Sequence, residues 1–370
     1  MPMKPESGLA DLGKLSNLRL LFVGESWRGS CARSLREAIS RRPDVVLDEV
    51  DEDHWFTKPR SLWLRAVNRL TAGAFQGEFR EQVFARVREF RPQVFMTYKG
   101  TLTDASSLAA LKALGLVTVN VYPDCSPHSS GDSHQKAVGE YDLVISTKPF
   151  HKSRWKEVYG YDNRCEFVPQ GYDPSLHLVE GPAPESDFDV VMVATWREEY
   201  AKLMQDFARN LGIDDLKVAI GGTGWAAHSG SFPRHWVFPG GLHGPTYVDW
   251  LRKGRICIAP LTRSVVFKGR QQPGDEDSTR TYELAAARCF FIHRRTDYVK
   301  SIFDEVTEVP MFGDSEELAL LVRRFLDQPA ERAKMAAAAQ RRAVPAYSLD
   351  MRAAQVLDIL RKFLLGQASR

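Results

Sequence analysis

The chain has 370 residues, and this length allows two domains of about 170–190 residues each. Apolar residues make up 44% of the sequence and charged residues 26%, which is an ordinary globular composition, and the net charge of +3 does not favour nucleic-acid binding by the whole chain. No apolar run reaches the roughly 18–20 residues of a membrane-spanning helix, and the first residues lack the apolar region of a secretory signal. The five cysteines are widely spaced and form no CxxC pair, so the sequence predicts a cytoplasmic protein without a metal site.

The first half of the chain alternates short apolar runs with amphipathic segments. Apolar runs without polar alternation are typical of strands buried on both faces, as in a parallel sheet covered by helices. This half therefore predicts a doubly wound α/β domain over residues 1–174. Strands are expected at Leu18–Val23, Val45–Val50, Val94–Tyr98, Val117–Tyr122, Leu143–Ser146 and Phe167–Val168, and helices at Ser30–Arg41 and Ala105–Leu114.

Two loops of this half follow strands and carry polar residues. The segment Gly24-Glu-Ser-Trp-Arg-Gly29-Ser30 resembles part of a P-loop but lacks its lysine, which argues against a kinase-type NTPase. It also lacks the GxGxxG pattern of a dinucleotide-dependent dehydrogenase. The second loop begins with Asp124, and His128 and His134 follow; these three are candidate groups for binding a substrate, although both histidines also fit ordinary loop polarity.

The segment from His54 to Pro92 is strongly basic. With the histidine omitted it holds eight positive and three negative residues, mixed with Trp55, Phe56 and Trp63. Basic residues among large aromatics suit a surface that meets anionic lipid headgroups or a polyanion. The alternative is a solvated pair of helices with its arginines on the solvent side.

The second half begins after the Pro/Gly-rich stretches Pro169–Pro174 and Gly181–Pro184, which are interpreted as an interdomain linker. Another β-α alternation then predicts a second Rossmann-like domain over residues 175–346, followed by a final helix in residues 347–370. Strands are expected at Asp189–Val193, Lys217–Ile220, Trp236–Phe238, Ile256–Ala259, Phe290–Ile292 and Val306–Val309. Helices are expected at Glu198–Asn210, Tyr247–Lys253, Thr281–Ala287, Ser315–Leu326, Pro329–Ala343 and Leu349–Leu365.

A loop rich in Gly and Asp leads into a helix that begins near Ser278 or Thr279. The free N–H groups of such a first turn can hold a diphosphate. Asp275 and Glu283 lie eight residues apart here, and Arg280-Thr-Tyr282-Glu283 is followed by small residues. Arg197 and Lys202, five residues apart after the strand that ends near Thr195, are the cations expected to meet that diphosphate. The alternative for each is a solvated helix face.

These motifs resemble the retaining GT-B glycosyltransferases, the glycosyl transferases group 1, and in particular the branch of the CgeB-like spore-maturation proteins. The resemblance implies two Rossmann-like domains that face a cleft, with the last helix crossing back to the first domain. It implies that Glu283 binds the donor ribose, that Asp275 contacts the transferred sugar and that Arg197 and Lys202 stabilise the diphosphate. Further donor-side candidates are Thr195, Gly222, His243, Ser278, Thr279, Arg280, Tyr282 and Gly29, with Lys268 and Arg270 next; Asp124 is the acceptor-side candidate.

The expected function is therefore a metal-independent, hexosyltransferase-type transfer from a nucleotide-sugar donor, with retention, to a carbohydrate, a lipid-linked or another hydroxyl acceptor. The donor is a substrate, and no cofactor or nucleic-acid partner is expected. The expected location is the cytoplasm, with peripheral contact at the inner membrane face. A nucleotide-sugar epimerase of the same layout and a non-catalytic module that binds nucleotide or glycan remain as alternatives.

Overall fold

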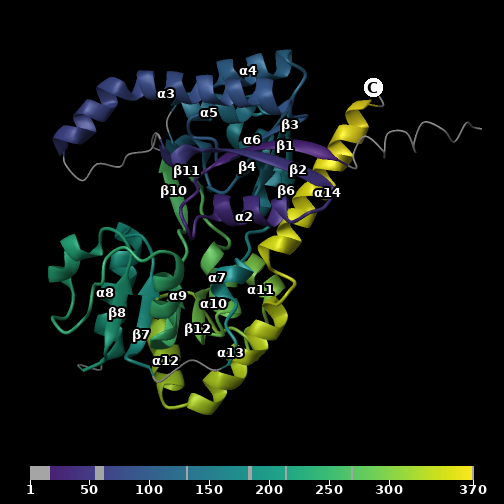
Figure 1. Ribbon diagram of the computed structural model, residues 1–370. Helices are drawn as coiled ribbons and strands as arrows, with labels where there is room; N and C mark the ends of the chain where they lie inside the picture. The colour runs from purple at the N-terminus through teal and green to yellow at the C-terminus, as the bar shows by residue number, and fades with distance from the viewer. Residues whose placement is uncertain are drawn as a thin grey trace, which may run out of the picture. The chain divides into compact units, whose positions relative to one another are not determined.

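The structure is a computed structural model that describes residues 17–54, 62–130, 132–181, 186–212, 215–267 and 270–368. It forms two compact units (Figure 1). Unit 1 contains the described parts of Met1–Pro169, Phe267–Gln272 and Arg352–Arg370. Unit 2 contains the described parts of Gln170–Val266 and Pro273–Met351. The change of unit after Pro169 lies five residues before the boundary predicted after residue 174.

The strands match most of the predicted apolar runs. They are β1 (Leu18–Gly24), β2 (Val45–Asp51), β3 (Val94–Tyr98), β4 (Val117–Tyr122), β5 (Leu143–Ser146), β6 (Arg164–Phe167), β7 (Phe188–Val193), β8 (Val218–Gly221), β9 (Gly254–Ala259), β10 (Ser264–Phe267), β11 (Arg270–Pro273), β12 (Phe291–Arg294) and β13 (Met311–Phe312).

Helices connect the strands. They are α2 (Cys31–Ser40), α3 (Leu62–Phe90), α4 (Ala105–Ala113), α5 (Asp132–Glu140), α6 (Pro149–Tyr159), α7 (Pro174–His177), α8 (Glu198–Leu211), α9 (Gly244–Arg252), α10 (Thr279–Ala286), α11 (Asp297–Ile302), α12 (Ser315–Leu326), α13 (Pro329–Ala343) and α14 (Leu349–Ala368). Short 3-10 helices occur at Glu52–His54, Pro127–Ser130 and Trp225–Ser231. None of the described helices is long and apolar enough to span a membrane.

Unit 1 is built on a parallel sheet with the strand order β2-β1-β3-β4-β5-β6. Burial of β1 on both faces explains the apolar run from Leu20 to Val23, because helices cover both sides of a parallel sheet. The last helix also belongs to this unit: Arg361 forms an ion pair with Asp44, and the Arg164 guanidinium lies over the Phe363 ring. This agrees with the predicted return of the final helix to the first domain.

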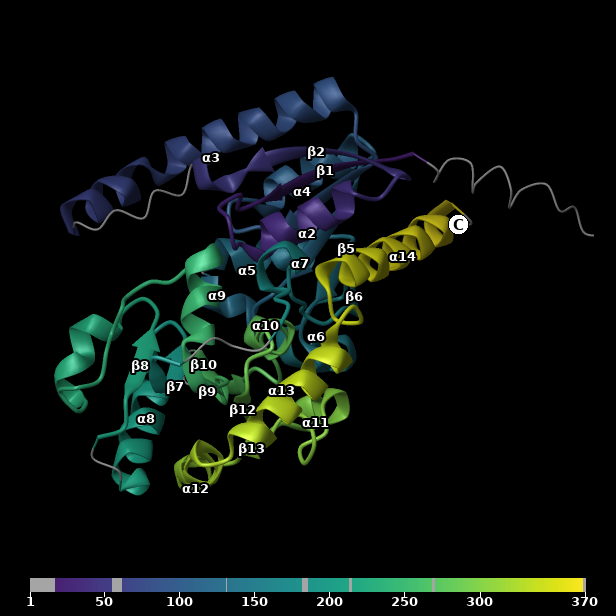
Figure 2. The same ribbon diagram turned by 60° about the horizontal axis from the view of Figure 1, so that its bottom comes forward.

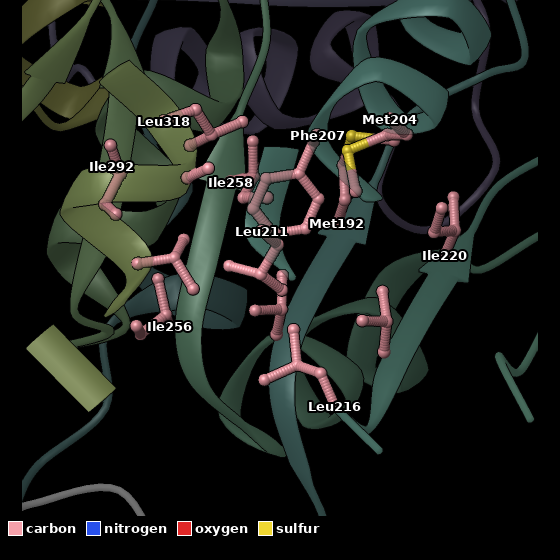
Figure 3. Packing of buried hydrophobic residues seen from close by; sticks show 14 of the residues in the cluster. Met192, Met204, Phe207, Leu211, Leu216, Ile220, Ile256, Ile258, Ile292 and Leu318 are labelled. Carbon is pink, nitrogen blue, oxygen red and sulfur yellow. The ribbon is translucent and has the colours of Figure 1, made fainter. Parts of the chain in front are cut away.

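Unit 2 is built on a second parallel sheet with the order β13-β12-β9-β7-β8. Helices α8 and α12 pack together on one face, where Met204, Phe207 and Leu318 interlock with Met192 and Ile258 (Figure 3). The apolar side chains of α9, α10 and α13 form a separate buried cluster with the other strand residues. Both units are therefore doubly wound α/β domains, as predicted.

Two predicted strands of unit 2 are wrong. Val306–Val309 is a turn, because the Asp304 carboxylate accepts the backbone N–H groups of Val306 and Thr307 and closes the chain on itself. The strand of this region is β13, a few residues later. The other segment, 236–238, forms only an isolated bridge, from Ala219 to Val237.

Candidate donor site and the carboxyl edge of the unit 1 sheet

The strand order of the unit 2 sheet indicates where a ligand would bind. The strand order reverses at β7, because β8 lies on one side of it and β9 on the other. In open α/β sheets, ligands bind outside the carboxyl ends of the strands at such a reversal. The loops after β7 and β9 and the loop that leads into α10 therefore border the candidate site.

The loop before α10 is held close to the end of β9. The Asp275 N–H donates to the carbonyl oxygen of Thr262 at 2.8 Å. A Cβ atom at Gly274 would lie 2.1 Å from that same oxygen, so only glycine allows this approach. Helix α10 then begins at Thr279 with Ser278 as its N-cap, as predicted from the sequence. The half-buried Asp275 carboxylate thus lies at the carboxyl end of the sheet.

A buried chain of hydrogen bonds anchors the first turn of α10. The Ser278 N–H donates to Thr281 Oγ1 at 3.1 Å, and Thr281 Oγ1 lies 2.8 Å from His293 Nε2. His293 Nδ1 lies 2.7 Å from the Arg294 carbonyl oxygen, so Nδ1 carries the proton and Nε2 accepts from the threonine hydroxyl. Burial lowers the pKa of His293 to about 4, which keeps the ring neutral. Sequence analysis missed His293, because it stands within an apolar strand.

Arg280 projects from this first turn to the end of β7. Its Nη1 donates to the carbonyl oxygen of Val193 at 3.0 Å, while Nε is buried and has no hydrogen-bond partner among the described residues. No carboxylate of the described residues forms an ion pair with the half-buried guanidinium. A desolvated cation without a counter-ion, beside the positive end of a helix, suits an anionic ligand.

Glu283 lies one turn further along α10, on the same side as Arg280 because the two are three residues apart. Its Oε2 accepts the Tyr247 hydroxyl at 2.7 Å, and its Oε1 lies 3.8 Å from His177 Nε2. Burial, and then the Glu283 charge, raise the pKa of Tyr247 well above its usual range, so the tyrosine remains a donor. Helices α7, α9 and α10 meet at this point (Figures 1 and 2).

Sequence analysis missed Tyr247 and His177. His177 lies between the two Pro/Gly-rich stretches that are interpreted as a linker, and the structure places it at the end of α7. Tyr247 lies in a helix that was predicted, but nothing in its neighbourhood indicates a carboxylate partner. Both contacts depend on tertiary structure alone.

Arg197 and Lys202 lie at the start of α8, which follows β7. Arg197 is the exposed N-cap residue, directly after the exposed Thr195 and the half-buried Trp196. Lys202 Nζ donates to Asp206 Oδ2 at 3.0 Å and its side chain is 74% exposed, so it must leave this pair to reach a ligand. The structure thus brings Thr195 and Arg197 to the strand end and leaves Lys202 one turn away.

Three other predicted donor-side residues have identifiable surroundings. Gly222 packs against the chain after β7: a Cβ there would lie 1.9 Å from the Ala194 oxygen, so this glycine shapes the loop. His243 is the exposed N-cap residue of α9. Tyr282 was expected at the ligand, but it is fully buried and its hydroxyl donates to Asp277 at 2.6 Å. We therefore correct its role to packing behind the site.

A cavity of about 210 Å³ lies between the first turns of α8 and α12 and the ends of β9 and β12. Lys202, Arg263 and Arg294 line it together with Glu199 and other acidic residues. Burial, and then the Arg263 charge, lower the pKa of Arg294. The cavity is smaller than the roughly 300–1,000 Å³ of most ligand sites, so it has room for only part of a nucleotide sugar.

In unit 1 the strand order reverses at β1, and the loops after β1 and β3 border the corresponding edge. Lys99, after β3, adopts a left-handed conformation with φ 66° and forms an ion pair of 2.9 Å with Asp124, which follows β4. The Asn120 amide donates to the Lys99 carbonyl oxygen at 3.0 Å and fixes this conformation. Gly29, with φ 104°, ends the loop after β1. Lys99 was not predicted from the sequence.

Buried titratable groups lie beneath this edge. Glu52 is 2% exposed, and burial, and then the charge of Glu25, raise its pKa to about 8. His134 is 3% exposed and stacks on Tyr122, and burial lowers its pKa. His128 packs against Tyr159. His134 is therefore a buried ring beneath the sheet edge.

Some predicted features lie outside the described residues. Lys268 and the side chain of Arg270 belong to these, as do Trp55 and Phe56 and the side chains of Trp63 and of the first arginines of the basic segment. Within the parts of the chain that the structure describes, no group of histidine, cysteine and acidic residues could hold a metal ion.

Comparisons with known proteins bear on the family and on the fold. Residues 197–358 match the model of a family described as glycosyl transferase-like. No curated protein sequence matches the chain at a significant level.

Solved structures match most of the chain. Sucrose-phosphate synthase from Thermosynechococcus elongatus aligns over 94% of this chain and 100% of its own, with a TM-score of 0.65 and 13% identity. Anabaena HepE in complex with UDP-glucose aligns over 93% and 100%, with a TM-score of 0.62 and 13% identity. A putative UDP-N-acetylglucosamine 2-epimerase from Listeria monocytogenes aligns over 95% and 97%, with a TM-score of 0.57 and 11% identity.

At these identities the structural likeness establishes the fold, which is the GT-B type with two Rossmann-like domains. The family match over the second half, together with this fold, supports a glycosyltransferase. Membership of the CgeB-like branch stays a prediction.

Proposed function

We propose that the protein is a glycosyltransferase that binds a nucleoside diphosphate sugar at the carboxyl end of the unit 2 sheet and transfers the sugar to a hydroxyl acceptor. The observation that carries the proposal is the pairing of Arg280 and Glu283 on one side of α10. A half-buried guanidinium without a carboxylate partner among the described residues suits the diphosphate, and a carboxylate one turn away suits the ribose hydroxyls.

The proposed reaction retains the anomeric configuration. As the bond between the anomeric carbon and the diphosphate oxygen breaks, negative charge grows on the leaving group. Arg280, Arg197 and the first N–H groups of α10 would stabilise that charge, joined by Lys202 once it leaves Asp206. The acceptor oxygen attacks from the face that the nucleotide leaves, and a phosphate oxygen takes its proton. The products are the glycoside and the nucleoside diphosphate, and the proposed route needs neither a protein nucleophile nor a bound metal.

The transferred sugar would contact Asp275, at the loop that precedes α10. This loop is fixed by its bond to Thr262, so the carboxylate is held near the proposed diphosphate without a change of backbone. Thr195, Ser278, Thr279 and His243 would complete the donor side.

A nucleotide-sugar epimerase is the second candidate, because an epimerase structure shares the fold. A purified protein tested by mass spectrometry against a panel of nucleotide sugars, with and without mixed sugar acceptors, separates the candidates. Transfer gives a new glycoside and a free nucleoside diphosphate, while epimerisation gives an isomeric nucleotide sugar without any acceptor. Binding without turnover would favour a non-catalytic module and would contradict the proposal.

The acceptor would bind at the carboxyl edge of the unit 1 sheet, where Asp124 and Lys99 form their ion pair and Gly29 ends the neighbouring loop. The basic segment His54–Pro92 supports a lipid-linked or polyanionic acceptor, in a cytoplasmic protein with peripheral membrane contact. Co-sedimentation with anionic but not neutral vesicles, lost at higher ionic strength, is the expected result. Failure to sediment with either would point to a soluble acceptor.

A further inference from the structure

The carboxylate of Glu283 is held in place by two side chains from outside its own helix. Tyr247 from α9 donates its hydroxyl proton to Oε2 at 2.7 Å. His177 from α7 presents Nε2 to Oε1 at 3.8 Å, and its ring lies edge-on to that of Tyr247, with a centroid distance of 6.1 Å. The two carboxylate oxygens therefore face different partners, and the hydrogen bond from Tyr247 restricts how the carboxylate can turn.

The tautomer of His177 follows from its second contact. The backbone N–H of Asp173 donates to His177 Nδ1 at 3.0 Å, so Nδ1 carries no proton in the neutral ring. The remaining ring proton is then on Nε2 and faces Glu283 Oε1. At 3.8 Å this contact is too long for a direct hydrogen bond. The partial positive charge of the Nε2–H group still attracts Oε1 and so helps to orient the carboxylate.

This arrangement leaves a defined set of acceptor sites. A carboxylate has about four lone-pair sites, and Tyr247 occupies one of them on Oε2. Oε1 and the second lone pair of Oε2 remain available within a residue that is only 8% exposed. Two neighbouring hydroxyl groups can use both oxygens at once, whereas a single hydroxyl would leave a buried acceptor unpaired.

We infer that Tyr247 and His177 are positioning residues that make the site selective for a donor with two vicinal pentose hydroxyls, a ribonucleoside diphosphate, over its 2′-deoxy counterpart. The inference rests on the proposed function, because it takes Glu283 as the group that meets the pentose. Because the Glu283 carboxylate is oriented before the donor binds, it can accept both hydroxyls without losing further conformational entropy on binding. A site built to bind a hydroxyl rejects the analogue that lacks it.

Calorimetry with UDP, 2′-deoxy-UDP, GDP and 2′-deoxy-GDP tests the inference. The wild-type protein should bind UDP or GDP at least about tenfold more tightly than the matching 2′-deoxy nucleotide. In Tyr247→Phe the preference should fall below about threefold, mainly through weaker binding of the ribonucleotide. Tyr347→Phe is the matched control, because the hydroxyl of this tyrosine donates to the Ile302 carbonyl oxygen. Its preference should equal that of the wild type.

Two histidine variants keep the test decisive if Tyr247→Phe does not fold. His177→Asn keeps an acceptor for the Asp173 N–H but removes the donor that faces Glu283, and it should reduce the preference. His177→Gln restores a donor near the position of Nε2 and should preserve more of the preference than the asparagine variant. Nucleotide binding with a preference unchanged in Tyr247→Phe and His177→Asn, or absent in the wild type, would overturn the inference and leave the proposed function standing. If neither UDP nor GDP nor any panel nucleotide sugar binds, the proposed function fails and the inference falls with it.

Discussion

Arg280 carries its charge to a half-buried position at the end of β7, where its described polar partner is the Val193 carbonyl oxygen. One N–H of the guanidinium holds this oxygen, and Nε is buried without a partner. Lysine could supply the positive charge. It could not also hold the Val193 oxygen and present a second N–H in a fixed direction, because its ammonium group is a point charge on a flexible stem. At the scale of a single residue, the geometry of the guanidinium therefore matters as well as its charge.

We predict that Arg280→Ala lowers the transfer rate by about 100-fold and that Arg280→Lys recovers only a small part of it. Initial rates of nucleoside diphosphate release from the donor identified in the panel would measure both. Arg252→Lys is the matched control, since Arg252 also donates to a backbone oxygen, that of Ala287, at the far end of α9. Wild-type rates in Arg280→Ala would remove this residue from the site.

The start of α10 shows what an element adds to its residues. The sequence predicted this start correctly, because a polar, glycine-containing loop followed by a run of small residues is a local signal. The partners that anchor it, His293 in β12 and Thr262 in the loop after β9, are distant in sequence and could not be recognised locally. Likewise, Val306–Val309 was predicted as a strand, but a neighbouring aspartate makes this segment a turn. Repeated apolar runs thus predicted most of the sheet, whereas side-chain contacts between elements, such as Tyr247 with Glu283, depend on the fold.

Thr281→Val tests the anchor of α10. The substitution keeps the side-chain shape but leaves the Ser278 N–H and His293 Nε2 without their buried partner. We expect the free energy of unfolding to fall by about 2–4 kcal/mol and nucleotide binding to weaken. Denaturant unfolding and calorimetry measure the two effects. Thr281→Ser keeps the hydroxyl and should stay close to wild type; equal losses in both variants would exclude the hydrogen bond as the cause.

The loop after β7 depends on Gly222 in the same way. This residue has φ 124°, and a Cβ there would lie 1.9 Å from the Ala194 oxygen. Gly222→Ala must therefore displace the segment that carries Thr195 and Arg197, and we expect a loss of about 2–4 kcal/mol of stability together with weaker donor binding. At Gly230 a Cβ would meet nothing within 4 Å, so Gly230→Ala is the control. Similar unfolding curves for the two variants would contradict the tight approach.

At the scale of the whole molecule, buried titratable groups limit the pH range of stability from both sides. Burial lowers the pKa of His151 to about 3 and that of His293 to about 4, below the unfolded value of 6.5. Their contribution to stability is present above pH 6.5 and is lost as the pH falls toward these values, because the unfolded state then binds more protons. Glu52 acts in the opposite direction. Its pKa of about 8 lies above the unfolded value of 4.5, so the folded state retains a proton that the unfolded chain releases.

This difference predicts the effect of Glu52→Gln. In the wild type, the contribution of Glu52 is fully present below about pH 4.5 and is lost as the pH rises through about 8. Glutamine has the shape of the protonated acid and cannot ionise, so the variant should match the wild type near pH 5 and exceed its free energy of unfolding by about 3–5 kcal/mol at pH 9. Denaturant unfolding at a series of pH values measures the difference. Glu78→Gln, at an exposed position on α3, should leave the pH profile unchanged. If the free energies of unfolding of wild type and Glu52→Gln stay parallel from pH 5 to 9, Glu52 does not keep its proton in the folded protein over this range. The prediction that it is a buried, neutral acid would then be wrong.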